Sequence, residues 1–157
     1  MGNISKIVEL LKNTWKLLSD NAFLGALAAS LISWLVIYYI TEKIKTKNKI
    51  QALQKELATN EYLLRYGKEI SIKNNSLERV HLHMDAFYQI INSNLQKQIG
   101  AETYGEIVRV YNDIKKHNQY ISSIEMGLRS VKNLGVYMDE WILLAEQIKE
   151  VDGKIKI

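Results

Sequence analysis

The sequence predicts an all-α protein in which a single membrane-spanning helix is followed by a helical domain. Two observations favour this fold class. The chain of 157 residues contains no proline, the residue that interrupts helices most strongly. Residues 21–40 contain no charged side chain, and a helix of that length extends about 30 Å, the thickness of the hydrocarbon core of a bilayer. We therefore divide the chain into an interfacial helix (1–20), a transmembrane helix (21–41), a basic collar with a helical stalk (42–73) and a cytoplasmic helical bundle (74–157), which gives about four helices beyond the span.

Residues 1–20 are predicted to form an amphipathic helix that lies in the membrane interface. Its apolar residues recur at steps of three and four, with lysines and a glutamate between them. The apolar positions are Ile4, Ile7, Val8, Leu11, Trp15 and Leu18. The helix is too short and too charged to span a bilayer.

The transmembrane assignment of residues 21–41 has two alternatives. A buried helix of a soluble bundle rarely keeps every face apolar over this length, and the charges before the run are too widely spaced for a signal peptide. Trp34, Tyr38 and Tyr39 lie near the end of the run, where aromatic rings prefer lipid headgroups. These features favour a true span.

Small residues form two rows in the span at steps of four, which keeps each row on one face. The rows are Ala22, Ala26 and Ser30, and Gly25, Ala29 and Ser33. They predict that the helices of several copies associate, so that the protein is a homo-oligomer in the lipid bilayer. The two serines either line a narrow pore or bond back to their own helix.

The basic collar consists of Lys43, Lys45, Lys47 and Lys49, which follow the span at every second position. Together with Lys55 they outnumber the three lysines before the span, so the positive-inside rule places the C-terminal domain in the cytoplasm, below the inner membrane. The stalk that follows carries a heptad seam, whose polar member, Asn60, can fix register and oligomer state. The apolar seam positions are Ile50, Leu53, Leu57 and Leu64, and Gly67 with residues 71–75 is expected to break the helix.

A second helix is predicted to begin at Asn75, because Asn75 and Glu78 have the spacing of a capping box. Its apolar face comprises Leu77, Val80, Met84, Phe87, Ile91 and Leu95, and it is expected to end at Gly100.

A third helix is predicted to begin at a capping box formed by Thr103 and Glu106 and to end near Gly135. Its seam has the strongest periodicity in the chain and comprises Ile107, Val110, Ile114, His117, Ile121, Ile124, Leu128 and Val131. A last helix places Tyr137, Trp141, Leu144, Ile148 and Val151 on one face and is expected to end at Gly153.

Catalytic and metal chemistry are not indicated. The chain has no cysteine and none of the usual hydrolase, kinase or metalloprotease motifs, so we expect neither an enzyme nor a cofactor. His81 and Asp85 are one helical turn apart on the predicted helix, but two ligands do not make a metal site and His83 points elsewhere. The net charge of +4 is too small to predict a face for duplex nucleic acid.

His117 is the candidate of most interest for ligand binding, because it interrupts an apolar seam among basic and aromatic residues. One interpretation is a histidine that is hydrogen-bonded inside the bundle or at a subunit contact. The other is an anion pocket at an axis where several subunits meet, in which cations bind phosphodiester groups and bases stack on Tyr120 or Tyr111. The candidate residues are Arg109, Lys115, Lys116, His117 and Tyr120, with Arg79 and Arg129 as secondary candidates.

The layout resembles a group of small membrane-anchored effectors of bacterial phage defence, such as the membrane proteins that accompany type III CRISPR systems and respond to cyclic oligoadenylates. The span at 21–40, the lysines of 43–49 and the basic cluster around His117 carry this resemblance. It implies that a cyclic oligonucleotide binds a cytoplasmic oligomer, which then disturbs the membrane.

Two other functions remain open. A membrane-anchored scaffold or phage-exclusion protein would recruit a protein partner and bind no small molecule. Its docking face would be the acidic last helix, with Asp139, Glu140, Glu146, Glu150 and Asp152. A constitutive pore-forming toxin or holin is the other alternative, although lysis needs no large cytoplasmic domain.

Overall fold

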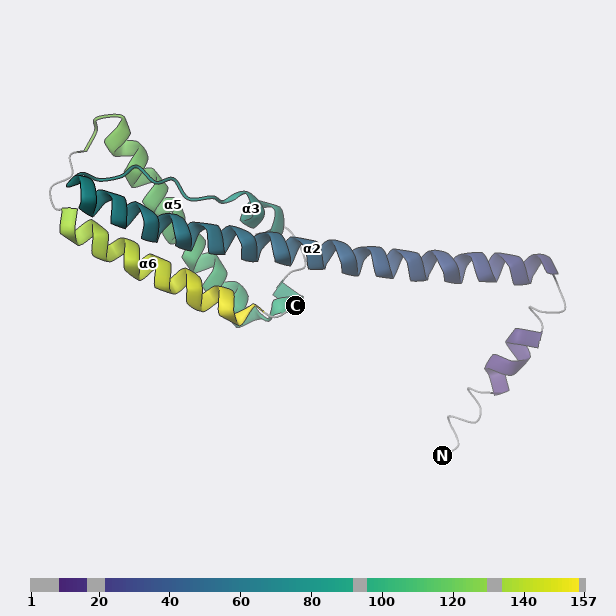
Figure 1. The fold of residues 1–157 in the computed structure, drawn as a ribbon. Helices are drawn as coiled ribbons and strands as arrows, with labels where there is room; N and C mark the ends of the chain where they lie inside the picture. Colours follow the sequence, from purple (N-terminus) through teal and green to yellow (C-terminus); the bar gives the residue numbers. More distant parts are fainter. Residues whose placement is uncertain (1–8, 17–21, 92–95, 130–133, 156–157) are drawn as a thin grey trace. The chain divides into compact units, whose positions relative to one another are not determined.

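The computed structural model describes residues 9–16, 22–91, 96–129 and 134–155, and every regular element in these ranges is a helix (Figure 1). Residues 9–16 are helical. The longer elements are α2 (Ala22–Asn74), α3 (Asp85–Ile91), α4 (Gln96–Ile99), α5 (Ala101–Glu125) and α6 (Leu134–Lys154). The predicted all-α class is therefore confirmed. The chain divides into an N-terminal unit, Met1–Lys45, and a C-terminal unit, Thr46–Ile157, with the boundary inside α2.

The N-terminal unit contains the helical residues 9–16 and the first part of α2. Of the apolar positions of the predicted amphipathic helix, Leu11 and Trp15 are exposed, and the others lie outside the described residues. The first part of α2 contains a window with a mean hydropathy of 2.0 and none of its residues buried. One helix is thus long and apolar enough to cross a membrane.

In the C-terminal unit, α2 buries one stripe of side chains. The stripe consists of Ile50, Leu53, Glu56, Leu57, Asn60, Leu64, Gly67 and Ser71. Its apolar members belong to a single core with side chains from α3, α5, α6 and the segment before α3. The predicted seam is therefore buried, and its partners come from its own chain.

Gly67 does not break the helix as predicted, because α2 continues through it to Asn74. A Cβ atom at Gly67 would lie 2.5 Å from Val80 Cγ2 and 2.8 Å from Trp141 Cζ3. These distances are too short for a methyl group beside two packed side chains. Glycine stands here because the neighbouring segments approach the α2 backbone closely.

The predicted helix from Asn75 is wrong in its first part, because Asn75 ends α2 instead of starting a new helix. Asn75 has a left-handed φ of 47°, a conformation that asparagine tolerates at a helix C-terminus. Its N–H donates to Ile72 O over 3.3 Å, and Ser76 N–H donates to Ser71 O over 3.1 Å. Residues 76–84, which we call the strap, are not helical, and α3 begins only at Asp85. Leu95 of the predicted face lies outside the described residues.

The third predicted helix corresponds to α5, but its ends differ from the prediction. It follows Gly100, which has a φ of 87°, and Thr103 lies inside the helix instead of capping it. Its C-terminus comes at Glu125 because Gly127 adopts a left-handed φ of 71° and donates its N–H to Ile124 O over 2.9 Å. Leu128, predicted in the seam, is 72% exposed, and Val131 lies outside the described residues.

The last helix, α6, includes Gly135, which was predicted to cap the preceding helix. It buries Met138, Trp141, Leu144, Ala145, Ile148 and Val151 and ends one residue beyond the predicted Gly153. Helix α6 runs antiparallel to α2, because Trp141 lies against Gly67 while Gln54 Nε2 donates to Ile155 O over 3.2 Å. In the C-terminal unit, α6 lies alongside α2, and α5 crosses α2 at an angle (Figure 1).

Candidate functional site

The strap is held by side-chain amides from two helices. Asn118 of α5 accepts from Leu82 N–H and donates to Leu82 O, both over 2.8 Å. Asn60 of α2 accepts from His83 N–H over 2.7 Å and donates to His83 O over 2.8 Å. Successive residues of an extended chain direct their peptide groups to opposite sides, so the two asparagines take the places that neighbouring strands would occupy in a sheet.

Two further side chains fix the start of the strap. Ser71 Oγ accepts from Glu78 N–H over 2.8 Å and donates to Gly67 O over 2.7 Å. His117 Nε2 lies 2.8 Å from Val80 O, so the ring carries its proton on Nε2 and donates it to this carbonyl. His117 thus holds the strap, as the hydrogen-bonded interpretation of this residue expected.

Burial lowers the pKa of His117, and the hydrogen bond to Val80 O opposes this shift only in part. The ring meets Trp141 edge-on, with the ring centroids 5.3 Å apart. His117 is therefore neutral at pH 7 and adds no positive charge to an anion site.

Glu56 fixes the start of α3 from a buried position on α2. Its carboxylate accepts from Ala86 N–H over 2.7 Å, Phe87 N–H over 3.2 Å and Tyr111 OH over 2.6 Å. Burial raises the pKa of Tyr111, whose ring stacks on Phe87 with centroids 4.1 Å apart. The carboxylate thus joins α2, α3 and α5 through one buried hydrogen-bonded group.

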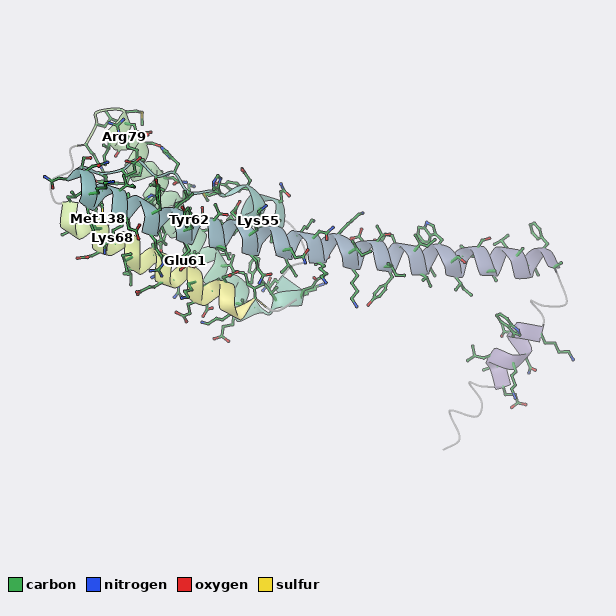
Figure 2. The ribbon with its side chains drawn as sticks, in the orientation of Figure 1. Lys55, Glu61, Tyr62, Lys68, Arg79 and Met138 are labelled. Carbon is green, nitrogen blue, oxygen red and sulfur yellow. The ribbon has the colours of Figure 1, made fainter. Side chains whose placement is uncertain are left out.

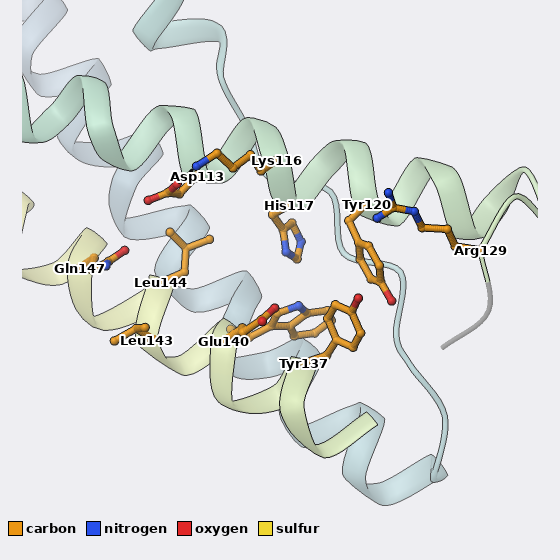
Figure 3. Close-up of a pocket in the computed structure, with 11 residues that line it drawn as sticks. Asp113, Lys116, His117, Tyr120, Arg129, Tyr137, Glu140, Leu143, Leu144 and Gln147 are labelled. Atoms are coloured by element: carbon orange, nitrogen blue, oxygen red, sulfur yellow. Dashed lines mark hydrogen bonds and ion pairs between the residues drawn. The ribbon is translucent and has the colours of Figure 1, made fainter. Parts of the chain in front are cut away.

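A pocket of about 420 Å³ opens between α5 and α6 (Figure 3). It brings together three of the predicted ligand residues, Lys116, His117 and Tyr120, with Arg129, one of the two secondary candidates. From α6 it receives Tyr137, Glu140, Trp141, Leu143, Leu144 and Gln147, and from α5 also Asp113. The close-up shows the α5 side chains facing the α6 side chains across the opening (Figure 3).

The pocket is aromatic and carries charges of both signs. Tyr120 and Tyr137 stack with centroids 4.2 Å apart, and the guanidinium carbon of Arg129 lies 5.9 Å from the centre of the Tyr120 ring. Lys116 Nζ pairs with Asp113 Oδ1 over 2.8 Å, while the hydroxyl oxygen of Tyr120 is buried with no hydrogen-bond partner within the described residues. Burial also raises the pKa of Tyr120. The site therefore offers one cation on an aromatic face, one cation paired with a carboxylate, and one unused hydroxyl.

The other predicted ligand residues do not line this pocket. Arg109 and Lys115 are exposed on α5. Arg79 is exposed on the strap (labelled in Figure 2). His81 Nε2 lies 3.0 Å from Glu125 Oε2. Across the described ranges, no group of three or more His, Asp or Glu side chains could hold a metal ion.

In the N-terminal unit, the predicted small-residue rows lie along α2 and are largely exposed. Of the six positions, Ala22, Ala26, Ala29, Ser30 and Ser33 are exposed and Gly25 is half-buried. The Ser30 hydroxyl donates to Ala26 O over 2.9 Å, so this serine bonds back to its own helix.

The collar lysines follow on the same helix. Lys45 Nζ pairs with Glu42 Oε1 over 2.9 Å, Lys43 and Lys47 are exposed, and Lys49 is half-buried.

The sequence reasoning missed Glu56 and Asn118 as structural residues, and Asp113, Tyr137 and Glu140 as pocket residues. Glu56 could have been found as a charged residue that lies between Leu53 and Asn60 at helical spacing, and therefore on the predicted seam. Nothing in the sequence marks the other four residues. Asn118 could not be found because the strap that it binds has no periodic signal. No family model, curated protein or solved structure matches the chain.

Proposed function

We propose that the chain is a single-pass protein of the inner membrane, with residues 21–41 in the bilayer and a helical bundle in the cytoplasm. One observation carries the anchoring. Twelve large apolar side chains between Phe23 and Ile40 each keep 46–72% of their surface exposed. Transfer of such a side chain out of water is worth about 1.5–3 kcal/mol, so together they favour the bilayer by roughly 20 kcal/mol.

The orientation follows from the lysines that flank the span. Five lysines, from Lys43 to Lys55, follow the span and three precede it. Basic residues near a span remain on the cytoplasmic side, where anionic lipids attract them. Residues 1–20 would then lie in the outer interface of the same membrane as an amphipathic helix.

In the C-terminal unit, the pocket between α5 and α6 is proposed to bind an anionic nucleotide, in line with the resemblance to cyclic-oligonucleotide effectors of phage defence. Arg129 and Lys116 suit phosphate, Tyr137 suits a base, and Glu140 suits the amino group of a base. Because α2 forms part of the core and continues into the span, a ligand that reorders the core would act on the membrane through α2.

The test uses the full chain in lipid nanodiscs and follows its thermal unfolding with cyclic di-, tri-, tetra- and hexanucleotides. A ligand at one hundred times its Kd should stabilise the fold by about 2.7 kcal/mol. The shift should disappear in Arg129→Ala and Lys116→Ala and persist in Lys149→Ala, since Lys149 is exposed on α6 and does not line the pocket. The ligand proposal is contradicted if no cyclic nucleotide stabilises the chain. It is also contradicted if Lys149→Ala removes the shift to the same extent as Arg129→Ala and Lys116→Ala.

A membrane-anchored scaffold or phage-exclusion protein is the second candidate. It is favoured by the exposed acidic side of α6, where Asp139, Glu140, Glu146 and Glu150 are all exposed. Co-purification of a stoichiometric protein partner, without any response to nucleotides, would favour this function over the first.

A further inference from the structure

The exposed side of α6 is both apolar and acidic. Val136 and Leu143 are 51% and 58% exposed, and four acids accompany them at helical spacing: Asp139, Glu140, Glu146 and Glu150. Of these acids, Glu150 pairs with Lys154 over 2.8 Å. We call this surface the acidic face. A helix face that combines exposed leucine and valine with several carboxylates is typical of a surface covered by a basic, apolar partner.

The exposed side of α2 in the C-terminal unit has the opposite character. Tyr62 and Tyr66 are 63% and 47% exposed and stack on each other with centroids 5.8 Å apart. Lys55 lies on one side of this pair along the helix and Lys73 on the other, and both are exposed (Lys55 and Tyr62 are labelled in Figure 2). One acid, Glu69, shares the surface. We call this surface the tyrosine face.

The two faces cover the same length of the C-terminal unit. Helix α6 is antiparallel to α2, with Trp141 beside Gly67 and Ile155 beside Gln54. This register puts Leu143 level with Tyr66. Measured along the helix axis, Glu150 lies within about one helical turn, about 5.4 Å, of the level of Lys55. Asp139 lies within about one turn of the level of Lys73. When two C-terminal units lie side by side with their α2 helices parallel, the acids of one copy therefore come within about one turn of the lysines of the next.

We propose that copies of this chain associate side by side, with the acidic face of one copy on the tyrosine face of the next. The contact rests on the proposed membrane anchoring, which aligns the copies and raises their effective concentration. It joins two different surfaces and is therefore heterologous, the kind of interface that closes into rings or continues as rows. Leu143 packs on the tyrosine pair while the lysines and acids form ion pairs around it.

Cross-linking in membranes tests the contact, because the chain has no cysteine of its own. Two differently tagged full-length chains are co-expressed, one with Tyr66→Cys and the other with Leu143→Cys, and oxidised. We expect a mixed disulfide between the two tags and little product from either variant alone. The matched control pairs Tyr66→Cys with Leu128→Cys, since Leu128 is more exposed than Leu143 (72% against 58%) but lies outside both faces. A mixed product no stronger than this control overturns the proposal.

Charge reversal separates this contact from other modes of association. Lys55→Glu with Lys73→Glu in the Tyr66→Cys chain should reduce the mixed disulfide about tenfold, since attraction becomes repulsion. Asp139→Lys with Glu150→Lys in the Leu143→Cys chain should restore it. Glu69→Lys should strengthen it, because Glu69 lies level with Asp139. If the reversals have no effect, or if the acidic face instead captures a separate basic protein, the proposal is wrong.

Carbonate extraction of the same membranes reports on the proposed function separately. If the chain stays in the membrane but the faces do not cross-link, only the association fails. If carbonate releases the chain, the anchoring itself fails.

Discussion

The two halves of α2 contain similar apolar residues and use them in different ways. In the half before Lys45, the large apolar side chains are exposed on every face of the helix. In the half after Thr46, the buried side chains are confined to one stripe, and three polar residues, Glu56, Asn60 and Ser71, are buried with them.

Under the proposed membrane anchoring, this difference shows how one helix is adapted to two surroundings. A helix in lipid needs no preferred face, because its backbone is satisfied internally and every side is apolar. A helix in a water-soluble domain needs one apolar stripe, and a polar residue within that stripe requires a partner. In the second half, each of the three buried polar residues binds a peptide group of the strap or of α3.

The largest expected difference between the two halves comes from a leucine in each. Leu57 is fully buried, so Leu57→Ala should lower the free energy of unfolding by about 4 kcal/mol. Leu31 is exposed in the first half, and Leu31→Ala should change the free energy of unfolding by less than about 0.5 kcal/mol. Thermal unfolding of the full chain in detergent micelles, followed by circular dichroism, measures both. Equal losses would mean that the first half is part of a folded core.

A methyl group at Gly67 gives the next largest effect. Val80 and Trp141 must both move to admit it, so Gly67→Ala should lower the free energy of unfolding by about 3 kcal/mol. Gly105→Ala is the matched control, because a Cβ there meets nothing within 4 Å. It should raise stability by up to about 1 kcal/mol through helix propensity alone. Stabilisation by both alanines would show that the strap does not approach α2 as closely as described.

Removal of a side chain that binds the strap is expected to lower the free energy of unfolding somewhat less. Asn60→Ala leaves the N–H and C=O of His83 without their partner, which should cost about 2 kcal/mol. Asn112→Ala on the exposed side of α5 is the control and should be close to neutral. Chemical denaturation in detergent measures the pair, and a neutral Asn60→Ala would mean that water replaces the amide without loss.

The smallest effect is a dependence on pH. The pKa of His117 is lowered in the folded chain, so the unfolded chain takes up a proton first as the pH falls below about 6.5. The contribution of His117 to the free energy of unfolding is therefore fully present above this pH and declines below it. His117→Gln should make the decline shallower between pH 7 and pH 5, as measured by melting temperature at each pH. A decline of unchanged slope would assign it to groups other than His117.

Regular periodicity was enough to predict the parts of the fold that consist of long helices. The uncharged run, the stripe from Ile50 to Leu64 and the seam of α5 up to Ile121 all correspond to helices with the expected exposure or burial. These signals work because a helix repeats its burial pattern over many residues, so that single exceptions do not hide it.

The strap could not be predicted in the same way. Leu77, Val80 and Met84 have helical spacing, but the backbone between them is extended because Asn60 and Asn118 replace its helical hydrogen bonds. Both asparagines are distant in sequence, so no local window contains the competing partner. The same reason explains why two interpretations of His117 stayed open from the sequence, since its partner Val80 is also remote.

The side-chain hydrogen bonds that hold the strap have a consequence for hydrogen exchange. Loops between helices usually exchange their amide protons quickly, because only water binds them. In the strap and at the start of α3, the N–H groups of Glu78, Leu82, His83, Ala86 and Phe87 are bound by side chains of α2 and α5. These protons exchange only when the helices separate, so a segment without regular structure exchanges as slowly as the core that surrounds it.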